Sequence, residues 1–397
     1  MAWVEKRGQH SWRVRYFTDD GSIASISGFA TKTAAEEEAN AIESDQRRGT
    51  WTDPAAGQTL LAEWVEEWLD ALDVGQRTEE NYRSKLRAQI LPRWGDTALA
   101  DITSTKVHAW AKTLRHSGLA DVTVTDTVKL LSLILADAAD DKRIPANPIR
   151  PRRRGRGRRI RKPEKVWATP EQVVQVADQA AAYYGPAAGM LILTAGWSGA
   201  RWGELVGLQR PNLHLDPVEK AHFVIDPDIG SLHESSSGRL WLGPPKTPES
   251  ARTVSLPPFL ARLLRDHLNT HDHRHVFVTP DEELHRRSNF SRRAMRPSAD
   301  GTTPAAHSRV RTEPVCPGLT FHGLRHSHKT WMIADGIPEV AQARRLGHQL
   351  PDKIQEIYSH VADEVETRLL SALQARWTIA LLELPEYDHD TTWRHTA

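Results

Sequence analysis

Two arginines, a histidine and a tyrosine in the C-terminal half of this 397-residue chain are of the types that could catalyse attack on a phosphodiester bond. Such attack needs cations that neutralise the charge developing on the non-bridging oxygens. Arg201 and Arg325 suit this task, because a guanidinium is planar, always charged and rich in donors. Tyr358 supplies a phenol that could act as the nucleophile. A covalent phenol–phosphorus bond would conserve the bond energy, so a strand could be resealed without a nucleotide cofactor.

His322 is the candidate for proton transfer, because imidazole titrates near neutral pH. It stands three residues before Arg325, which places both side chains on one face of a helix. Each residue has a simpler interpretation when taken alone. A His-x-x-Arg pair is more often a solvated helix face, and a single tyrosine in a helix is usually part of the core. The order of the motifs around these residues therefore carries the argument.

Five groups of residues occur in a fixed order over about 160 residues, and together they closely resemble the tyrosine recombinase, or phage integrase, family. They are GARWGEL at 199–205, PKT at 245–247 with RTV at 252–254, HGLRH at 322–326, LGH at 346–348 and IYSH at 357–360. Each motif alone is weak, since short patterns recur by chance. The complete ordered set is specific.

The resemblance implies a role for each matching residue. Arg201 and Arg325 would stabilise the pentacoordinate transition state, and Glu204 would hold the first of them in place. Lys246, in a β-hairpin, would protonate the leaving 5′ oxygen. The further roles are proton transfer by His322, a hydrogen bond from His348 to the scissile phosphate, and a 3′-phosphotyrosyl bond at Tyr358. His326, His328 and His360 are expected to be structural, and Lys220 is a second lysine in the region of Lys246.

The net charge of +1 hides one strongly basic segment. Residues 149–165 contain ten lysines and arginines against one acid, Glu164. Such a run cannot bury a core and should stay extended until it meets an anion. We expect it to follow the DNA backbone without reading sequence. The candidate DNA-binding residues in it are Arg152, Arg153, Arg154, Arg156, Arg158, Arg159, Arg161 and Lys162.

The patterns divide the chain into four parts and predict a mainly helical fold with small β-sheets (α+β). Residues 1–52 read as a three-stranded sheet plus a helix and resemble an arm-type DNA-binding domain. In this part Arg13 and Arg15 alternate with buried aromatic positions and would project into a DNA groove. Residues 59–148 read as a helical bundle, 149–165 as a basic linker, and 166–397 as a mixed α/β domain. The bundle resembles the core-binding domain of the family, and the mixed domain resembles its catalytic domain. Within the last part, 221–256 is strand-rich and broken by a polar loop, SLHESSSGR.

Several classes of protein and site are disfavoured. The single cysteine, Cys316, excludes an internal disulfide framework and fits the cytoplasm of a bacterial host. The uncharged run 179–200 is interrupted by glycines and a proline, so we interpret it as a buried helix rather than a membrane span. The histidine cluster at His267, His271, His273 and His275 lacks the other ligands of a metal shell. No metal or cofactor is expected.

These observations predict a site-specific DNA recombinase, the integrase of a phage or mobile element, which works through a Holliday junction. Its expected partners are double-stranded DNA at core and arm attachment sites, three further copies of the chain in a homotetramer, an excisionase and a host DNA-bending protein. The alternatives are a type IB topoisomerase-like or resolving enzyme and a non-catalytic DNA-bridging protein of the same fold. An apolar helix after Tyr358 could pack on its own domain or on a neighbouring protomer.

Overall fold

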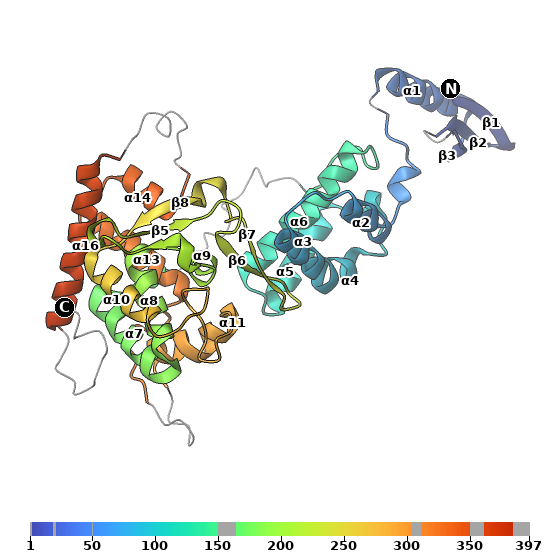
Figure 1. Ribbon diagram of the computed structural model, residues 1–397. Coiled ribbons are helices and arrows are strands. Elements are labelled where there is room, and N and C mark those ends of the chain that lie inside the picture. The colour runs from blue at the N-terminus through green and yellow to red at the C-terminus, as the bar shows by residue number, and fades with distance from the viewer. Residues whose placement is uncertain are drawn as a thin grey trace. The chain divides into compact units, whose positions relative to one another are not determined.

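The computed structural model describes residues 2–18, 21–49, 51–149, 164–302, 311–349 and 361–383. The chain divides into two compact units, Met1–Arg159 and Ile160–Ala397. Tyr358 and the candidate DNA-binding residues at 152–162 lie outside the described residues. The fold is mainly helical with small sheets, as the sequence predicts (Figure 1).

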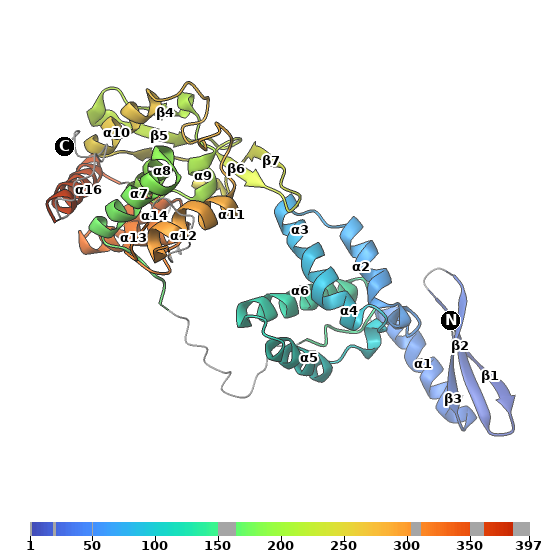
Figure 2. The same ribbon diagram turned by 90° about the horizontal axis from the view of Figure 1, so that it is seen from below.

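The N-terminal sheet is antiparallel in the order β1-β2-β3, and helix α1 covers one face of it (Figure 2). Val14 and Tyr16 point into a small core with Ala35, Ala39 and Ile42 of α1. This confirms the predicted alternation along β2. The elements are β1 (Ala2–Gly8), β2 (Ser11–Phe17), β3 (Ile23–Phe29) and α1 (Lys32–Arg48).

The rest of the first unit is a bundle of helices around a tryptophan-rich core. On α2, Leu61, Trp64, Val65 and Trp68 are buried, as their spacing predicts. Trp94 is fully buried and meets the ring of Trp110 edge to face. The main helices are α2 (Leu61–Asp70), α3 (Gln76–Lys85), α4 (Leu91–Trp94), α5 (Ser104–His116) and α6 (Asp121–Asp140).

The second unit is built around α8, which packs against α7, α9, α10 and α13 (Figures 1 and 2). Every residue of α8 from Ala188 to Ser198 is buried, so the part of the uncharged run that follows Gly185 is a core helix, as expected. No helix among the described residues is long and apolar enough to cross a membrane. The helices are α7 (Pro170–Tyr184), α8 (Pro186–Ser198), α9 (Trp202–Val206), α10 (Pro258–Leu268), α11 (Arg287–Phe290), α12 (Arg296–Asp300), α13 (Phe321–Ala334), α14 (Glu339–Leu346) and α16 (Asp363–Glu383).

The C-terminal helix α16 packs on its own unit. Leu369, Leu373, Trp377 and Ala380 are buried against α7 and α10. The indole of Trp197 in α8 donates a hydrogen bond to the carbonyl of Leu373 at 3.0 Å. The sequence left open whether this helix packs within its own chain, and these contacts show that its described part does.

Two small sheets belong to the second unit. One has the order β4-β5-β8, and the other is a separate hairpin of β6 and β7. Strand β6 occupies the first part of the segment that the sequence predicts as a polar loop. Three of its four side chains are polar and only partly buried, which hid the strand pattern in the sequence. The strands are β4 (Leu213–His214), β5 (His222–Ile225), β6 (Ser231–Glu234), β7 (Leu240–Gly243) and β8 (Arg252–Ser255).

Lys246 lies in the connection from β7 to β8, which belong to different sheets. The expected position of Lys246 in a β-hairpin is therefore wrong in detail. The physical reason is the additional hairpin, which pairs β6 with β7 and leaves β8 to pair with β5. Lys246 is exposed in this connection.

Candidate active site

The first arginine of the candidate site is positioned by a sharp end to helix α8. Gly199 has a φ of 67°, and a Cβ there would lie 2.7 Å from the ring of His328 and from Leu346. Glycine is required because it alone combines this conformation with that close approach. The chain then turns into α9, where the backbone amide of Arg201 donates to Glu204 Oε2 at 2.8 Å.

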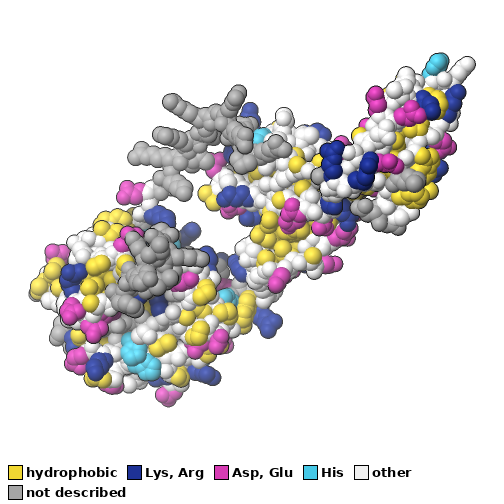
Figure 3. Space-filling model, turned by 90° about the horizontal axis from the view of Figure 1, so that it is seen from above, with side chains coloured by type: hydrophobic (Ala, Val, Ile, Leu, Met, Phe, Trp, Pro, Cys, Tyr) yellow, Lys and Arg dark blue, Asp and Glu magenta, His cyan; other side chains and the backbone are white. Residues whose placement is uncertain are grey.

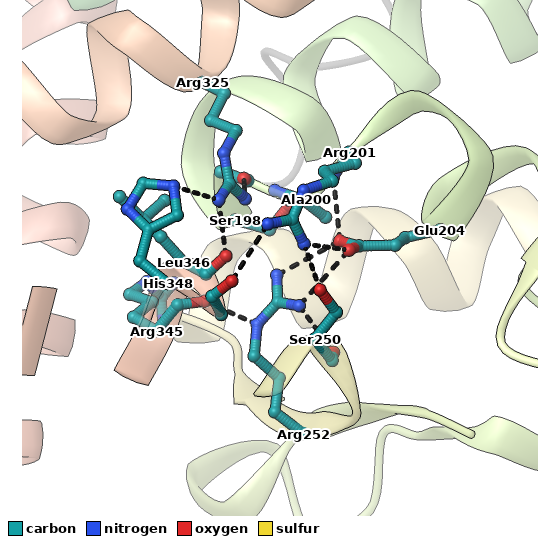
Figure 4. A network of polar contacts seen from close by, with 12 residues as sticks. Ser198, Ala200, Arg201, Glu204, Ser250, Arg252, Arg325, Arg345, Leu346 and His348 are labelled. Atoms are coloured by element: carbon teal, nitrogen blue, oxygen red, sulfur yellow. Dashed lines mark hydrogen bonds and ion pairs between the residues drawn. The ribbon is translucent and has the colours of Figure 1, made fainter. Parts of the chain in front are cut away.

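The guanidinium of Arg201 is held by three groups (Figure 4). Nη1 donates to Glu204 Oε1 and to Ser250 Oγ, each at 2.7 Å, and Nη2 donates to the carbonyl of Gly347 at 2.9 Å. These partners come from α9, from the turn before β8 and from the end of α14. The side chain is 22% exposed, so its orientation is fixed while part of it still faces solvent.

Arg325 extends from α13 toward the same place and is 4% exposed. Its Nη1 donates to the carbonyl of Gly199 at 2.7 Å, and its Nη2 donates to Leu346 and, at 2.8 Å, to His348 Nε2. Burial and the charges of Arg201 and Arg252 lower the pKa of Arg325 to about 9. The structure thus brings Arg201, Glu204, Arg325 and His348 together from segments far apart in the chain (Figure 4).

The histidines of the candidate site are neutral at neutral pH. Burial, together with Arg325 and Arg201, lowers the pKa of His348 to about 4. Its Nε2 accepts from Arg325, so its proton is on Nδ1. Burial and then the charges of His326 and Arg325 lower the pKa of His322 to about 4. A neutral imidazole has an unprotonated ring nitrogen, which is the state that accepting a proton from a nucleophile requires.

Arg252 and Ser250 belong to the same network, although the sequence assigned no role to either. The two Nη atoms of Arg252 donate to the two oxygens of Glu204 at 3.3 and 3.1 Å, and its Nε donates to the carbonyl of Arg345 at 2.7 Å. Its side chain is only 7% exposed. Glu204 is therefore the shared counter-ion of two arginines. Burial acts to raise its pKa, but the two arginines lower it below the ordinary value. The RTV motif contained the signal for Arg252, whereas a lone serine gave none.

On the N-terminal sheet, Arg13 and Arg15 lie on the face away from the buried Val14 and Tyr16, as expected. Arg13 forms two hydrogen bonds with Glu5 Oε2, at 2.9 and 2.7 Å. Arg15 lies 5.7 Å from the ring centre of Trp3 and 3.6 Å from the same carboxylate. Glu5 therefore offsets part of the positive charge on this face.

The histidine cluster at and after the end of α10 forms hydrogen bonds around Arg210. Arg210 donates to the carbonyls of Leu268 and His273 at 2.8 Å, and His267 contacts the carbonyl of Val276 at 2.8 Å. Within the described ranges, no group of three or more histidine, cysteine or acidic side chains could hold a metal ion.

Buried histidines make the free energy of unfolding depend on pH. Burial lowers the pKa of His267 and of His285 to about 4. The unfolded chain takes up these protons near pH 6.5 and the folded chain only near pH 4, so stability falls as the pH drops through this range. We expect a loss of about 2 kcal/mol for each of the two histidines between pH 7 and pH 5. Urea unfolding at both pH values measures it.

His285→Phe provides the matched variant for this measurement. His285 is 2% exposed and lies among Tyr184, Trp202 and Phe290, which suits an aromatic replacement. The difference in unfolding free energy between the two pH values should shrink in this variant. An unchanged difference would show that His285 does not contribute.

Comparison with known proteins places this geometry in a family. Residues 168–365 match the phage integrase family, and residues 60–115 match the phage integrase N-terminal SAM-like domain. The phiRv2 prophage integrase of Mycobacterium tuberculosis is 28% identical over 378 residues, which cover 91% of this chain and 92% of that relative.

Solved structures share the fold at low identity. A Tn1549 transposon integrase in complex with transposon right-end DNA has a TM-score of 0.59 at 15% identity, over 79% of this chain and 99% of the other. A lambda integrase tetramer bound to a Holliday junction has a TM-score of 0.53 at 18% identity, over 90% of this chain and 94% of the other.

The chain belongs to the phage integrase family. It is a tyrosine-type site-specific recombinase, an integrase of the kind found in mycobacterial prophages and phages.

Proposed function

We propose that this integrase inserts and excises a phage or mobile element by cutting and rejoining double-stranded DNA through a 3′-phosphotyrosyl intermediate and a Holliday junction. The observation that carries the proposal is the fixed pair of guanidiniums at Arg201 and Arg325, locked by Glu204, Ser250 and backbone carbonyls. Two oriented donor groups that are charged at neutral pH suit the two non-bridging oxygens of one phosphate.

In the cleavage step, the phenol oxygen of Tyr358 bonds to phosphorus as the bond from phosphorus to the 5′ oxygen breaks. The phenol proton passes to His322, which is neutral and can accept it. Lys246 gives a proton to the leaving 5′ oxygen. Arg201, Arg325 and His348 hold the phosphate, and religation reverses each transfer. No cofactor takes part in these transfers.

We infer the partners from the same proposal. Lambda integrase forms a tetramer on a Holliday junction, and we propose a homotetramer on two core sites for this chain. We further propose that residues 1–52 bind arm sites through Arg13 and Arg15, that 59–148 bind the core site opposite the catalytic domain at 166–397, and that the linker 149–165 follows the phosphate backbone. An excisionase and a host DNA-bending protein would set direction in the cytoplasm of a bacterial host.

The charge distribution supports local rather than overall attraction to DNA. On the face shown in Figure 3, lysine and arginine side chains lie among aspartate and glutamate side chains. The net charge of the whole chain is only +1. Affinity should therefore depend on particular basic groups.

Mapping covalent adducts over the genomic DNA that flanks the coding sequence tests the function. Nicked duplexes trap the protein, because the released fragment leaves and prevents religation. We expect one 3′-linked adduct per strand at a defined site and recombinant products from two such sites. Relaxation of supercoiled plasmid at any sequence, without recombinants, would favour the topoisomerase-like alternative. Binding without adducts would favour the DNA-bridging alternative.

The role of Lys246 can be tested against Lys220, a second exposed lysine in the same unit. Lys246→Ala should slow cleavage by about 10²-fold or more, as expected for loss of a general acid. A substrate with sulfur in place of the leaving 5′ oxygen should restore the rate, since a thiolate leaves without protonation. Lys220→Ala should cleave both substrates like the unaltered protein. If sulfur fails to rescue Lys246→Ala, that lysine is not the proton donor.

A further inference from the structure

The residues from Lys165 to Ala168, which lead into α7, lie along helix α13 and are held there by hydrogen bonds. The amide of Ala168 donates to Ser327 Oγ at 2.8 Å, and the indole of Trp331 donates to the carbonyl of Ala168 at 3.1 Å. A Cβ on Gly323 would lie 3.2 Å from the carbonyl oxygen of Val166. Because residue 323 has no side chain, the segment can approach the helix closely. Lys165 is therefore held beside the first turns of α13.

The outer face of α13 carries a row of basic side chains. His322, His326 and Lys329 follow one another at intervals of four and three residues, so they lie along one side of the helix. The rings of His322 and His326 are 4.7 Å apart, edge to face. None of these three side chains is fully buried.

Cations surround His326. Burial lowers its pKa, and the charges of Lys165, Arg325 and Lys329 lower it further. Lys165 also lowers the pKa of His322. Lys329 also contributes to lowering the pKa of His348. Lys165 and Lys329 both therefore lie close enough to His326 for their charges to act on it.

The acid at the C-terminal end of α13 does not offset this charge. Asp335 accepts hydrogen bonds from Arg376 of α16 at 2.6 and 2.9 Å. That carboxylate is therefore engaged by another arginine. Asp335 therefore does not neutralise the charges of Lys165 and Lys329, which give this face its positive character beside the neutral histidines.

The length of the row from His322 to Lys329 fits the spacing of phosphates along a DNA strand. From His322 to Lys329 the helix rises about 10 Å. One strand of duplex DNA places a phosphate every ~3.4 Å along its axis. With the scissile phosphate at Arg201 and Arg325, the row therefore lies within reach of the phosphates that follow it.

Given the proposed function, on which this step rests, we propose that Lys165, His326 and Lys329 form a second phosphate-binding site that holds the DNA backbone next to the scissile phosphate. His326, expected from the sequence to be structural, is a backbone ligand here. This second site positions the DNA strand, whereas Arg201 and Arg325 bind the phosphate at which cleavage occurs.

The experiment uses the full chain on nicked duplexes that carry a single neutral methylphosphonate at successive phosphates beside the cleavage site. Neutralising one of these phosphates should weaken binding of the unaltered protein about tenfold. The same replacement should have no further effect on the Lys165→Ala/Lys329→Ala variant. The slope of log affinity against log salt should fall by about 2 in that variant. The matched control, Lys220→Ala, should keep both the slope and the methylphosphonate effect.

Three outcomes would overturn the second site. The first is an unchanged salt slope in the double variant, and the second is a variant as sensitive to every methylphosphonate as the unaltered protein. The third is a variant that binds DNA normally but fails to assemble with other copies, which would mean that the row contacts an acidic protein surface. Lys165→Arg/Lys329→Arg should restore binding, which excludes a folding defect. Adduct formation by the unaltered protein tests the proposed function separately.

Discussion

Replacing Tyr358 with phenylalanine abolishes covalent adducts with DNA and leaves non-covalent binding intact. The change removes one oxygen, and that oxygen is the proposed nucleophile. Histidine, lysine and the arginine pair can still bind and polarise the phosphate, but no protein atom can take the place of the 5′ oxygen. We expect adducts on nicked duplexes to fall by more than about 10³-fold. Denaturing gels measure the adduct, and gel-shift titration measures the affinity.

Tyr183→Phe is the matched control for this prediction. Tyr183 is a partly exposed tyrosine of α7, and its variant loses the same hydroxyl group from another position. This variant should form adducts at the unaltered rate. Adducts that persist in Tyr358→Phe would identify a different nucleophile, and peptide mapping of the DNA-linked fragment would locate it.

Replacing Glu204 with alanine should lower both the free energy of unfolding and the rate of DNA cleavage. The carboxylate is 2% exposed and contacts Arg201 at 2.7 Å and Arg252 at 3.1 Å. Its loss leaves the buried Arg252 without a counter-charge, which costs about 3–5 kcal/mol of unfolding free energy. Arg201 also loses two of its fixing contacts, to its backbone amide and to its side chain. We expect cleavage to fall by about 10²-fold or more.

A double variant separates the two roles of Glu204. In Glu204→Gln/Arg252→Met, the acid and the more deeply buried arginine are both neutral, so most of the lost stability should return. Arg201 still lacks its carboxylate partner, so cleavage should stay low. Chemical unfolding and single-turnover cleavage of nicked duplex give the two readouts. If stability and cleavage recover together, Glu204 contributes to stability alone and does not position Arg201.

Much of the candidate site could be predicted from the sequence because several of its contacts join residues that are close together in the chain. Arg201 and Glu204 are three residues apart, and their contact arises within one turn of α9. His322 and Arg325 are likewise neighbours on α13. Patterns of period two and 3.6 predicted strand β2 and helix α2 for the same reason. The hairpin of β6 and β7 was partly missed because its strands are short and half exposed.

The sequence by itself determined the class of chemistry, the family and the order of the elements, because these depend on residue types and on short spacings. Only the tertiary structure decided which groups share the site. The contacts of Arg201 with Ser250, of Arg325 with Gly199 and of Arg252 with Glu204 join residues 49, 126 and 48 positions apart. Such contacts exist only after the helices and the small sheet pack. The same packing made Glu204 a partner of two arginines and fixed Lys165 along α13.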